Sequence, residues 1–434
     1  MGKCITVAVA GYGLRGKCYS QLVKKSGDRV KIVAVGEIDK EKLAEAKAEY
    51  DLADDMCFLS AEEMLEQPKL ADIMFIATQD RQHVPQAVKA VERGYHVMVE
   101  KPISPDLHEC LELQDKAHEY NRIVTVCHVL RYSAFYQKVK EVIESGDLGE
   151  VRNIQAVEDV GYFHQAHSFV RGNWRNSIET SPMILAKSCH DMDILQWLMN
   201  KTCTRISSYG SLSLFKEDKA PEGSSDRCLD GCKCKEACPY DAEKIYITNK
   251  FTGVRDNGGR WPCTALTLNP TEDTVYEALK TGPYGRCVYK CDNDVVDHQV
   301  VIMEFENGAT ADFNMTAFTR KPGRQIRVMG TMGELSGDVG TGIMNIYRFG
   351  KEAEIVDVSK LANCPLGHAG GDARLVESTI SMLESNDLSK NLTSIDASVH
   401  SHVMALAAEH SRLNNGASVN LDEFIKNQRV LAEI

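Results

Sequence analysis

The sequence predicts an α/β protein: an N-terminal doubly wound parallel sheet, then a C-terminal α+β domain with a large, mostly antiparallel open sheet. Short apolar strands alternate with helical stretches over residues 1–126, and longer strands of alternating polarity follow. A chain of 434 residues is also too long for one core of common size. We therefore expect two domains, 1–126 and 127–434, with a cysteine-rich insertion at about 216–291.

The first predicted strand leads into a glycine-rich turn. The apolar run Ile5 to Ala10 precedes Gly11 to Gly16, which has the G-x-G-x-x-G spacing of a Rossmann domain. Such a turn lets the backbone approach a pyrophosphate and points a helix N-terminus at the phosphates. A second strand, Val30 to Val35, leads to Glu37, whose carboxylate would bind ribose hydroxyls and repel a 2′-phosphate. These features predict NAD as the cofactor rather than NADP.

The strand and helix alternation continues through the rest of the first domain. Apolar strands are expected at Ile73 to Ala77, His96 to Val99 and Ile123 to Val126. Helices are expected at Asp39 to Tyr50 and Gln82 to Arg93. Helices that alternate with short buried strands are typical of a parallel sheet covered on both faces.

Longer strands mark the second domain. Gln299 to Phe305 and Ala309 to Phe318 alternate in polarity and flank Asn307-Gly308, a strong hairpin turn. Three further helices are expected, at Met183 to Met199, Ala373 to Ser385 and Ser398 to Asn414.

Composition narrows the class of protein. The net charge of -12 argues against a nucleic-acid surface, and no apolar stretch is long enough to span a membrane. Because no secretion signal is visible, we expect a cytoplasmic protein whose 15 cysteines stay reduced. The charge balance favours an uncharged or small partner molecule, such as a carbohydrate.

Several short motifs together resemble one family. They are the glycine turn, Ala77-Thr78-Gln79-Asp80 followed by His83, Gly94-Tyr95-His96-Val97, and Glu100-Lys101-Pro102. With them the chain resembles, over nearly its whole length, the glucose-fructose oxidoreductase and inositol dehydrogenase (Gfo/Idh/MocA) family, and most closely a branch that acts on sugars and glycosides. The resemblance implies that Lys101 lies beside the nicotinamide and the substrate, and that a cis bond precedes Pro102. The residues expected to bind the cofactor are Gly11, Tyr12, Gly13, Leu14, Arg15, Gly16, Glu37, Thr78, Gln79, His83, Glu100 and Lys101.

The family's next landmark is altered in this chain. The family places an aspartate and a histidine four residues apart on one helix, whereas here His190 is kept, Ala186 replaces the acid, and Lys187 follows it. On a continuous helix Lys187, His190 and Asp191 share one face, so we expect Lys187 and Asp191 to pair around His190.

Oxidation of a secondary alcohol requires a base for the hydroxyl proton and a positive field for the developing alkoxide. We assign the acid/base role to His190, the hydrogen bond to the reacting oxygen to Lys101, and added positive potential to Lys187. Two alternatives stay open. The lysines could exchange roles if repulsion lowers the pKa of one of them, or His190 could be a core histidine beside a surface Lys187 paired with Asp191.

Substrate contacts are expected from residues near the predicted domain junction and from a polar loop containing a tryptophan. A tryptophan and several hydrogen-bonding side chains suit a pyranose ring, although an ordinarily packed tryptophan would give the same pattern. The residues are Arg131, Tyr132, His164, His167, Arg171, Trp174, Asp191, and, in a stretch that resembles the family's sugar site, His368 and Asp372.

Seven of the 15 cysteines fall between Cys228 and Cys291. This density suggests a structural metal, zinc before iron-sulfur, that would fix an insertion too polar to form its own core. The alternative is a group of reduced thiols packed under the loop. The expected ligands are Cys228, Cys232, Cys238 and Cys287.

These inferences predict an NAD-dependent oxidoreductase that interconverts a hydroxyl and a ketone on a sugar, glycoside or polyol, with C3 of a pyranoside as the expected position. One alternative is a glycosidase that recycles NAD through transient oxidation and elimination, and another is a non-catalytic NAD-sensing regulatory protein. From the resemblance, and because the apolar sheet face Val300 to Phe318 needs a cover, we expect a homodimer or homotetramer.

Overall fold

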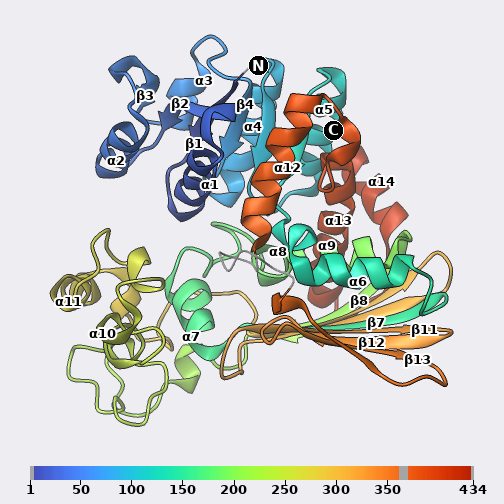
Figure 1. Ribbon diagram of the computed structural model, residues 1–434. Coiled ribbons are helices and arrows are strands. Elements are labelled where there is room, and N and C mark those ends of the chain that lie inside the picture. The colour runs from blue at the N-terminus through green and yellow to red at the C-terminus, as the bar shows by residue number, and fades with distance from the viewer. Residues whose placement is uncertain (1–3, 361–369, 432–434) are drawn as a thin grey trace.

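The computed structural model describes residues 4–360 and 370–431, which form two sheets with helices packed between and around them (Figure 1). The first sheet is parallel throughout, with strand order β3-β2-β1-β4-β5-β6. This arrangement confirms the doubly wound Rossmann sheet predicted from the sequence. Its strands are β1 (Ile5–Ala10), β2 (Val30–Gly36), β3 (Cys57–Phe58), β4 (Ile73–Ile76), β5 (His96–Val99) and β6 (Val124–Val126).

Three helices of the first domain, α2, α3 and α5, begin at side-chain caps. The Asp39 side chain accepts hydrogen bonds from the backbone N–H groups of Glu41 and Lys42, so the second helix begins at Lys40. The two helices predicted here are confirmed to within one residue at each end. The helices are α1 (Leu14–Lys25), α2 (Lys40–Tyr50), α3 (Ala61–Leu65), α4 (His83–Glu92) and α5 (Leu107–Glu119).

The turn between β1 and α1 requires glycine at two positions. Gly11 has φ +85°, and a Cβ there would lie 2.8 Å from the carbonyl oxygen of Ala77. A Cβ on Gly16 would lie 1.9 Å from the carbonyl oxygen of Gly11. Gly13 differs, because no atom lies within 4 Å of the position of its Cβ. The turn is therefore tightly packed behind Gly11 and Gly16 and open in front of Gly13.

The second sheet has nine strands in the order β14-β13-β12-β11-β7-β10-β9-β8-β15, and only the β7–β10 pair is parallel. The predicted mostly antiparallel sheet is thus confirmed, as is the hairpin at Asn307-Gly308, where Gly308 has φ +73°. The strands are β7 (Val151–Asp159), β8 (Cys203–Ser211), β9 (His298–Phe305), β10 (Thr310–Thr316), β11 (Gly323–Gly330), β12 (Gly333–Asp338), β13 (Ile343–Arg348), β14 (Glu354–Asp357) and β15 (Val419–Asn420).

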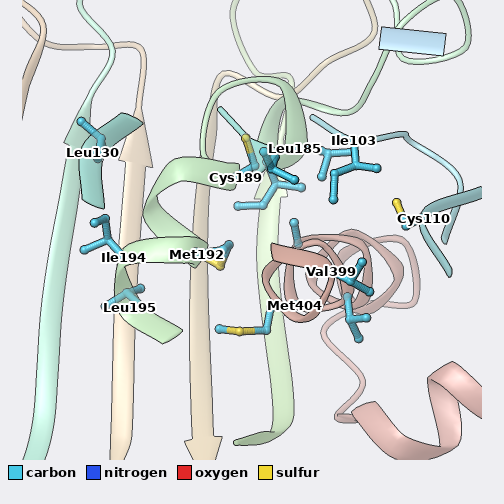
Figure 2. Close-up of a cluster of buried hydrophobic side chains, with 14 of the residues drawn as sticks. Ile103, Cys110, Leu130, Leu185, Cys189, Met192, Ile194, Leu195, Val399 and Met404 are labelled. Atoms are coloured by element: carbon cyan, nitrogen blue, oxygen red, sulfur yellow. The ribbon is translucent and has the colours of Figure 1, made fainter. Parts of the chain in front are cut away.

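Helices from both ends of the second domain pack on the inner face of this sheet. Figure 2 shows the apolar side chains between them, with Met192, Leu185 and Met404 completely buried. The helix α12 instead packs against α1 and thereby joins the C-terminal part of the chain to the first domain. The helices are α6 (Ala134–Glu144), α7 (Tyr162–His164), α8 (Met183–Ala186), α9 (Cys189–Met199), α10 (Val254–Asn257), α11 (Glu272–Thr281), α12 (Gly371–Ser385), α13 (Ile395–Leu413) and α14 (Leu421–Leu431).

The helix expected at Met183 to Met199 is interrupted. It is formed by α8 and α9, which are separated at Lys187 and Ser188. The residues that follow the break therefore do not continue the face of α8, so the side chains of Lys187 and of α9 need not share one helical face.

The outer face of the nine-stranded sheet carries exposed apolar side chains. In Figure 1, α6 and α9 lie above the sheet, and no labelled helix lies beneath it. Ile302, Tyr209 and Ile355 are 55%, 58% and 70% exposed. The homodimer or homotetramer that would cover this face stays a prediction.

The segment between β8 and β9 contains the stretch 216–291 and is called the insertion below; it has a core of its own. Phe215, Tyr246, Val275 and Leu279 are buried there with Val170, which lies outside the insertion. The expectation that the insertion is too polar to form a core is therefore wrong, because its aromatic and aliphatic residues are widely spaced in sequence and converge only after folding. Within residues 4–360 and 370–431, the search for a helix with the length and apolarity needed to cross a membrane finds none.

Candidate active site

A cavity of about 220 Å³ lies where the two domains meet. The first domain lines it with residues at the carboxyl ends of its strands, where α/β sheets bind ligands. The second domain closes it with residues that surround α7, α8 and α9, together with one side chain of β11. The lining residues are Arg15, Ala77, Thr78, Asp80, His83, Glu100, Lys101, Cys127, His164, Ser168, Phe169, Trp174, Ala186, Lys187, His190 and Arg324.

The N-terminus of α1 is built to receive an anion. Gly13 caps this helix without a side-chain hydrogen bond, and no acidic residue occupies the first turn. The open space in front of Gly13 leaves these N–H groups accessible, and the positive end of the helix dipole favours phosphate. The residues present therefore fit the pyrophosphate of a dinucleotide.

Glu37 lies directly beside this turn. Its carboxylate accepts hydrogen bonds from the backbone N–H of Tyr12, at 2.6 Å, and of Asp39, at 2.9 Å. These contacts hold a negative charge at the end of β2, where the ribose of a dinucleotide binds in this fold. The side chain is in place for the predicted discrimination against a 2′-phosphate.

The ends of β4 and β5 are fastened together beside the cavity. The two ring nitrogens of His83 lie 2.7 Å from the carbonyl oxygen of Pro102 and 3.2 Å from that of Thr78. The Thr78 hydroxyl in turn donates to Gln86 at 2.8 Å. Among the other predicted cofactor residues, Gln79 precedes a short helical turn and Leu14 is 54% exposed at the start of α1.

Arg15 joins three parts of the chain at the cofactor side of the cavity. Its guanidinium pairs with Glu100 at 2.7 Å and with Asp372 at 2.5 Å. Burial alone would raise the pKa of Glu100, but Arg15 and Lys101 hold it below its ordinary value. Asp372, expected from the sequence to contact the substrate, is thus an ion-pair partner of Arg15 and does not line the cavity.

The three predicted catalytic side chains all line this cavity. Lys101 follows β5 and a cis bond joins it to Pro102, as the family resemblance implied. Its ammonium donates to the carbonyl oxygen of Ala186, at the end of α8, over 3.0 Å. Lys187 lies at the break between α8 and α9, and His190 lies in the first turn of α9. One cation from the first domain therefore meets a cation and an imidazole from the second.

The expected pairing of Lys187 with Asp191 is wrong. Lys187 Nζ pairs with Glu158 Oε1 at 3.0 Å, while Asp191 Oδ1 pairs with Arg324 Nε at 2.8 Å. Arg324 Nε also lies 2.7 Å from Glu158 Oε2, so the four groups form one network. The break after α8 lets Lys187 reach β7 rather than its own helix.

Burial governs the charge states in this network. It lowers the pKa of Lys187, although Glu158 opposes the shift, and it raises the pKa of Glu158 against the effect of Arg324 and Lys187. The nearby His164 has a pKa well below its ordinary value because of burial and then because of Lys187. His164 lines the cavity, and its lowered pKa favours the neutral imidazole.

Sequence reasoning missed Glu158 and Arg324. The sequence held a signal for Glu158, because it follows Ile154 and Ala156 in the buried register of β7, where an unpaired acid would be costly. Arg324 opens a strand far along the chain, and its pairing with the acids follows only from the β7–β11 register.

The predicted substrate residues separate into two groups. His164 and Trp174 line the cavity, and the indole N–H of Trp174 donates to Asp80 at 3.2 Å. Arg131 instead makes a bidentate pair with Asp193, with both distances 2.7 Å. Three other predicted substrate residues also lie away from the cavity. Tyr132 is buried with its hydroxyl 3.3 Å from Thr393 Oγ1, His167 Nδ1 lies 2.8 Å from the Tyr246 hydroxyl, and Arg171 points into the insertion. His368 lies outside the described residues.

Cys228, Cys232, Cys238 and Cys287 lie around a second, smaller cavity inside the insertion. In the part of the chain that the structure describes, every cysteine is an unbridged thiol, and no three His, Cys, Asp or Glu side chains are already arranged to hold a metal ion.

Comparison with known proteins identifies the family. Residues 5–128 match the model of the GFO_IDH_MocA oxidoreductase family's NAD-binding Rossmann fold, and residues 140–421 match that of its C-terminal alpha/beta domain. The chain belongs to the Gfo/Idh/MocA oxidoreductase family. It is 22% identical to the Bacillus subtilis protein YteT over 386 residues, which cover 84% of this chain and 86% of YteT.

Two solved structures with bound ligands share the fold. An inositol dehydrogenase homolog from Azotobacter vinelandii, complexed with NADH and myo-inositol, is 16% identical, with a TM-score of 0.66 over 96% of this chain and 98% of that one. The WlbA dehydrogenase from Bordetella pertussis, in complex with NADH and UDP-GlcNAcA, is 16% identical, with a TM-score of 0.68 over 96% and 98% of the two chains. At this level of identity the two likenesses show that the chains share one fold.

Replacing Arg324 should destabilise the protein far more than replacing a second arginine of the same strand. Arg324→Met leaves two buried carboxylates with only Lys187 as a cation, which we expect to cost about 3 kcal/mol in the free energy of unfolding. Arg327 pairs with Glu334 at the surface, with 48% of its side chain exposed, so Arg327→Met should cost less than about 1 kcal/mol. Urea unfolding measures the free energy of unfolding of both variants. Equal decreases in the two variants would contradict a stabilising ion-pair network around Arg324.

Proposed function

We propose that the protein uses NAD to interconvert a hydroxyl group and a ketone on a sugar, glycoside or polyol, with C3 of a pyranoside as the expected position. The observation that supports this most is the convergence of Lys101, Lys187 and His190 on one cavity beside the glycine turn. An alcohol dehydrogenation needs both positive charge and a proton acceptor near the reacting carbon, and this cavity supplies them.

The cofactor is held by groups of the first domain. The N–H groups of the turn Gly11 to Gly16 and the N-terminus of α1 would hold the pyrophosphate, and Glu37 would hold the ribose hydroxyls. A bound NAD would supply the hydride acceptor and donor. The carboxylate of Glu37, already fixed by Tyr12 and Asp39, makes NAD the preferred dinucleotide.

The chain's own residues move the proton and stabilise the oxyanion. His190 takes the hydroxyl proton, and Lys101 donates a hydrogen bond to the same oxygen as its charge develops. Lys187 adds positive potential, and Glu158, 3.0 Å away, opposes the lowering of the Lys187 pKa by burial. The alternative exchange of roles, with Lys187 as the base, depends on how far burial lowers its pKa.

Two observations support a carbohydrate-like substrate. The cavity of about 220 Å³ is lined by the aromatic side chain of Trp174 together with polar groups such as His164 and Asp80. Structures similar to this chain have been solved with myo-inositol and with a nucleotide sugar. A ring that carries several hydroxyl groups is the common feature.

Incubation with NAD⁺ and a panel of inositols, free sugars and glycosides tests the reaction class. We expect stoichiometric NADH and one carbonyl, located by NMR. Release of free sugar from an aryl glycoside without net NADH would instead identify the NAD-recycling glycosidase. Binding of NAD⁺ with no turnover of any member would contradict the dehydrogenase and favour the regulatory alternative.

His190→Ala and Lys101→Ala should each lower kcat by about 100-fold or more, because each removes a group that acts on the reacting oxygen. Binding of NAD⁺, measured by calorimetry, should stay near the wild-type value. Lys138→Ala serves as the control, since this lysine pairs with Glu141 on the exposed face of α6. Turnover like that of the wild type in either catalytic variant would refute the assignment.

The pH profile of Glu158→Gln distinguishes the two roles of Lys187. Glu158 raises the pKa of Lys187, so its loss lowers that pKa further. If Lys187 acts as a cation, the alkaline limb of kcat/KM moves to lower pH by about one unit. Movement of the acidic limb would identify Lys187 as the base, and an unchanged profile would exclude it from both roles. Glu334→Gln, which loses a surface pair, is the control.

A further inference from the structure

We propose that the insertion binds one zinc ion through the thiolates of Cys228, Cys232, Cys238 and Cys287. The site lies apart from the catalytic cavity and would serve to hold the wall of that cavity in place.

The first observation is the cavity inside the insertion. Its volume is about 20 Å³, and five cysteines surround it. A space that holds about one water-sized sphere accommodates a single metal ion and is too small for a cluster of several iron and sulfur atoms. Thiolates in tetrahedral arrangement are the ligands typical of structural zinc.

The second observation is Arg171, which lines the same cavity and is completely buried. Its Nη2 donates to Cys228 Sγ at 3.5 Å and to the carbonyl oxygen of Tyr240 at 2.8 Å, and its Nε donates to the carbonyl oxygen of Arg286 at 2.7 Å. Within the described ranges, Nη1 has no hydrogen-bond partner and no carboxylate forms an ion pair with this guanidinium.

Among the described residues the guanidinium of Arg171 forms no ion pair, and the one carboxylate that lines the same cavity is that of the buried Asp241. A buried charge without a counter-ion costs several kcal/mol, which natural proteins rarely leave uncompensated. Zinc held by four thiolates carries net negative charge, since the four ligand charges outweigh that of the ion. Zinc binding therefore stabilises Arg171, and Arg171 stabilises the thiolate form of the ligands.

The proposed set leaves out two neighbouring cysteines, Cys234 and Cys291, although Cys228 Sγ, like their thiols, donates to a backbone carbonyl oxygen, that of Arg286, at 3.9 Å. The fifth cysteine of the cavity, Cys234, donates its thiol to the carbonyl oxygen of Glu222 at 3.1 Å. Cys291 does not line the cavity and donates to the carbonyl oxygen of Cys287 at 3.2 Å. The four remaining thiols surround the cavity without yet being arranged to ligate, so binding requires them to rotate inward and release their protons.

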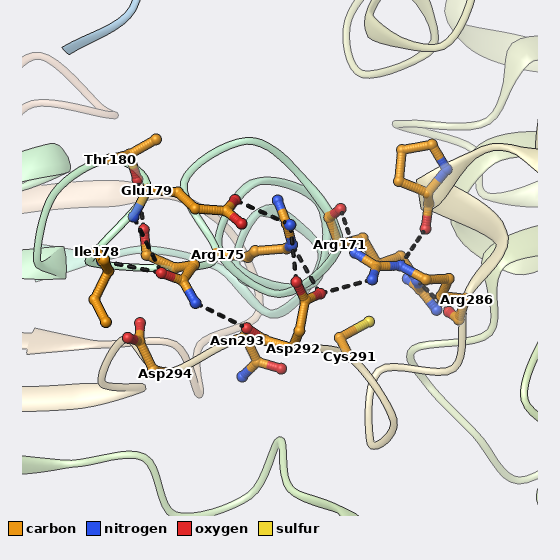
Figure 3. A network of polar contacts seen from close by, with 12 residues as sticks. Arg171, Arg175, Ile178, Glu179, Thr180, Arg286, Cys291, Asp292, Asn293 and Asp294 are labelled. Carbon is orange, nitrogen blue, oxygen red and sulfur yellow. Dashed lines mark hydrogen bonds and ion pairs between the residues drawn. The ribbon is translucent and has the colours of Figure 1, made fainter. Parts of the chain in front are cut away.

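The position of Arg171 connects this site to the catalytic cavity. Arg171 ends the helical segment Gln165–Arg171, of which Ser168 and Phe169 line the catalytic cavity. Figure 3 shows that the same end is braced from outside: Arg286 donates to the carbonyl oxygen of Arg171 at 3.1 Å and pairs with Asp292 at 2.7 Å. Zinc binding would fix the opposite side of this segment.

Elemental analysis of protein purified without chelators tests the proposal. We expect about one equivalent of zinc per chain and no acid-labile sulfide. Less than about a tenth of an equivalent of any metal would overturn the site. Iron with sulfide would overturn the assignment to zinc, and disulfides among the four cysteines, found by mass spectrometry, would overturn their role as ligands.

Variants test the ligand set. Cys232→Ser and Cys238→Ser should lower the zinc content at least tenfold, and cobalt added to the metal-free wild type should give the visible absorption of a tetrathiolate site. Cys234→Ser and Cys263→Ser, in the same insertion, are matched controls that should keep the metal. Retention of zinc by both ligand variants, or loss of zinc from Cys234→Ser, would contradict the proposed set of four ligands. Urea unfolding, compared with that of the wild type, reports whether each variant is folded.

Discussion

Two buried carboxylates, Glu158 and Asp191, are held by two cations, Lys187 and Arg324, at the junction of the sheet domain and the catalytic helices. Glu158 is on β7 and Arg324 is on the neighbouring β11, whereas the other two residues adjoin or belong to α9. The network therefore ties the start of α9 to the sheet. Since each group would be costly to bury alone, the four fix one another's positions.

That constraint determines where the catalytic groups meet. The break between α8 and α9 turns Lys187 toward β7 and leaves His190 on the cavity wall. Lys101 reaches the same wall from the first domain and is held by the carbonyl oxygen of Ala186. The site thus depends on the way the domains pack, and the apolar layer seen in Figure 2 lies directly behind it.

The sequence was most informative where the chemistry is local. The glycine turn and Glu37 follow from spacing alone, because both belong to the βαβ unit of β1, α1 and β2, in which the Glu37 carboxylate accepts from the backbone N–H of Tyr12. The pairing of Lys187 with Asp191 was inferred from an unbroken helix, and the strand residues that compete for both partners are distant in sequence. Glu158 and Arg324 were missed for the same reason.

The contacts of the predicted substrate residues likewise depend on residues that are distant in sequence. Trp174 and His164, both from the segment before α8, line the cavity, but Arg171 belongs to the insertion side of its helical segment. Arg131, although polar and at the domain junction, is held by Asp193. Residue type alone does not reveal which face of a segment meets the cavity, because that depends on packing with the insertion.

A crystal structure of the complex with NAD⁺ tests the central claim most directly. The account predicts the pyrophosphate on the N-terminus of α1 and the nicotinamide ring in the cavity between Lys101 and His190. An ordered nicotinamide elsewhere, or an empty glycine turn at saturating NAD⁺, would contradict it.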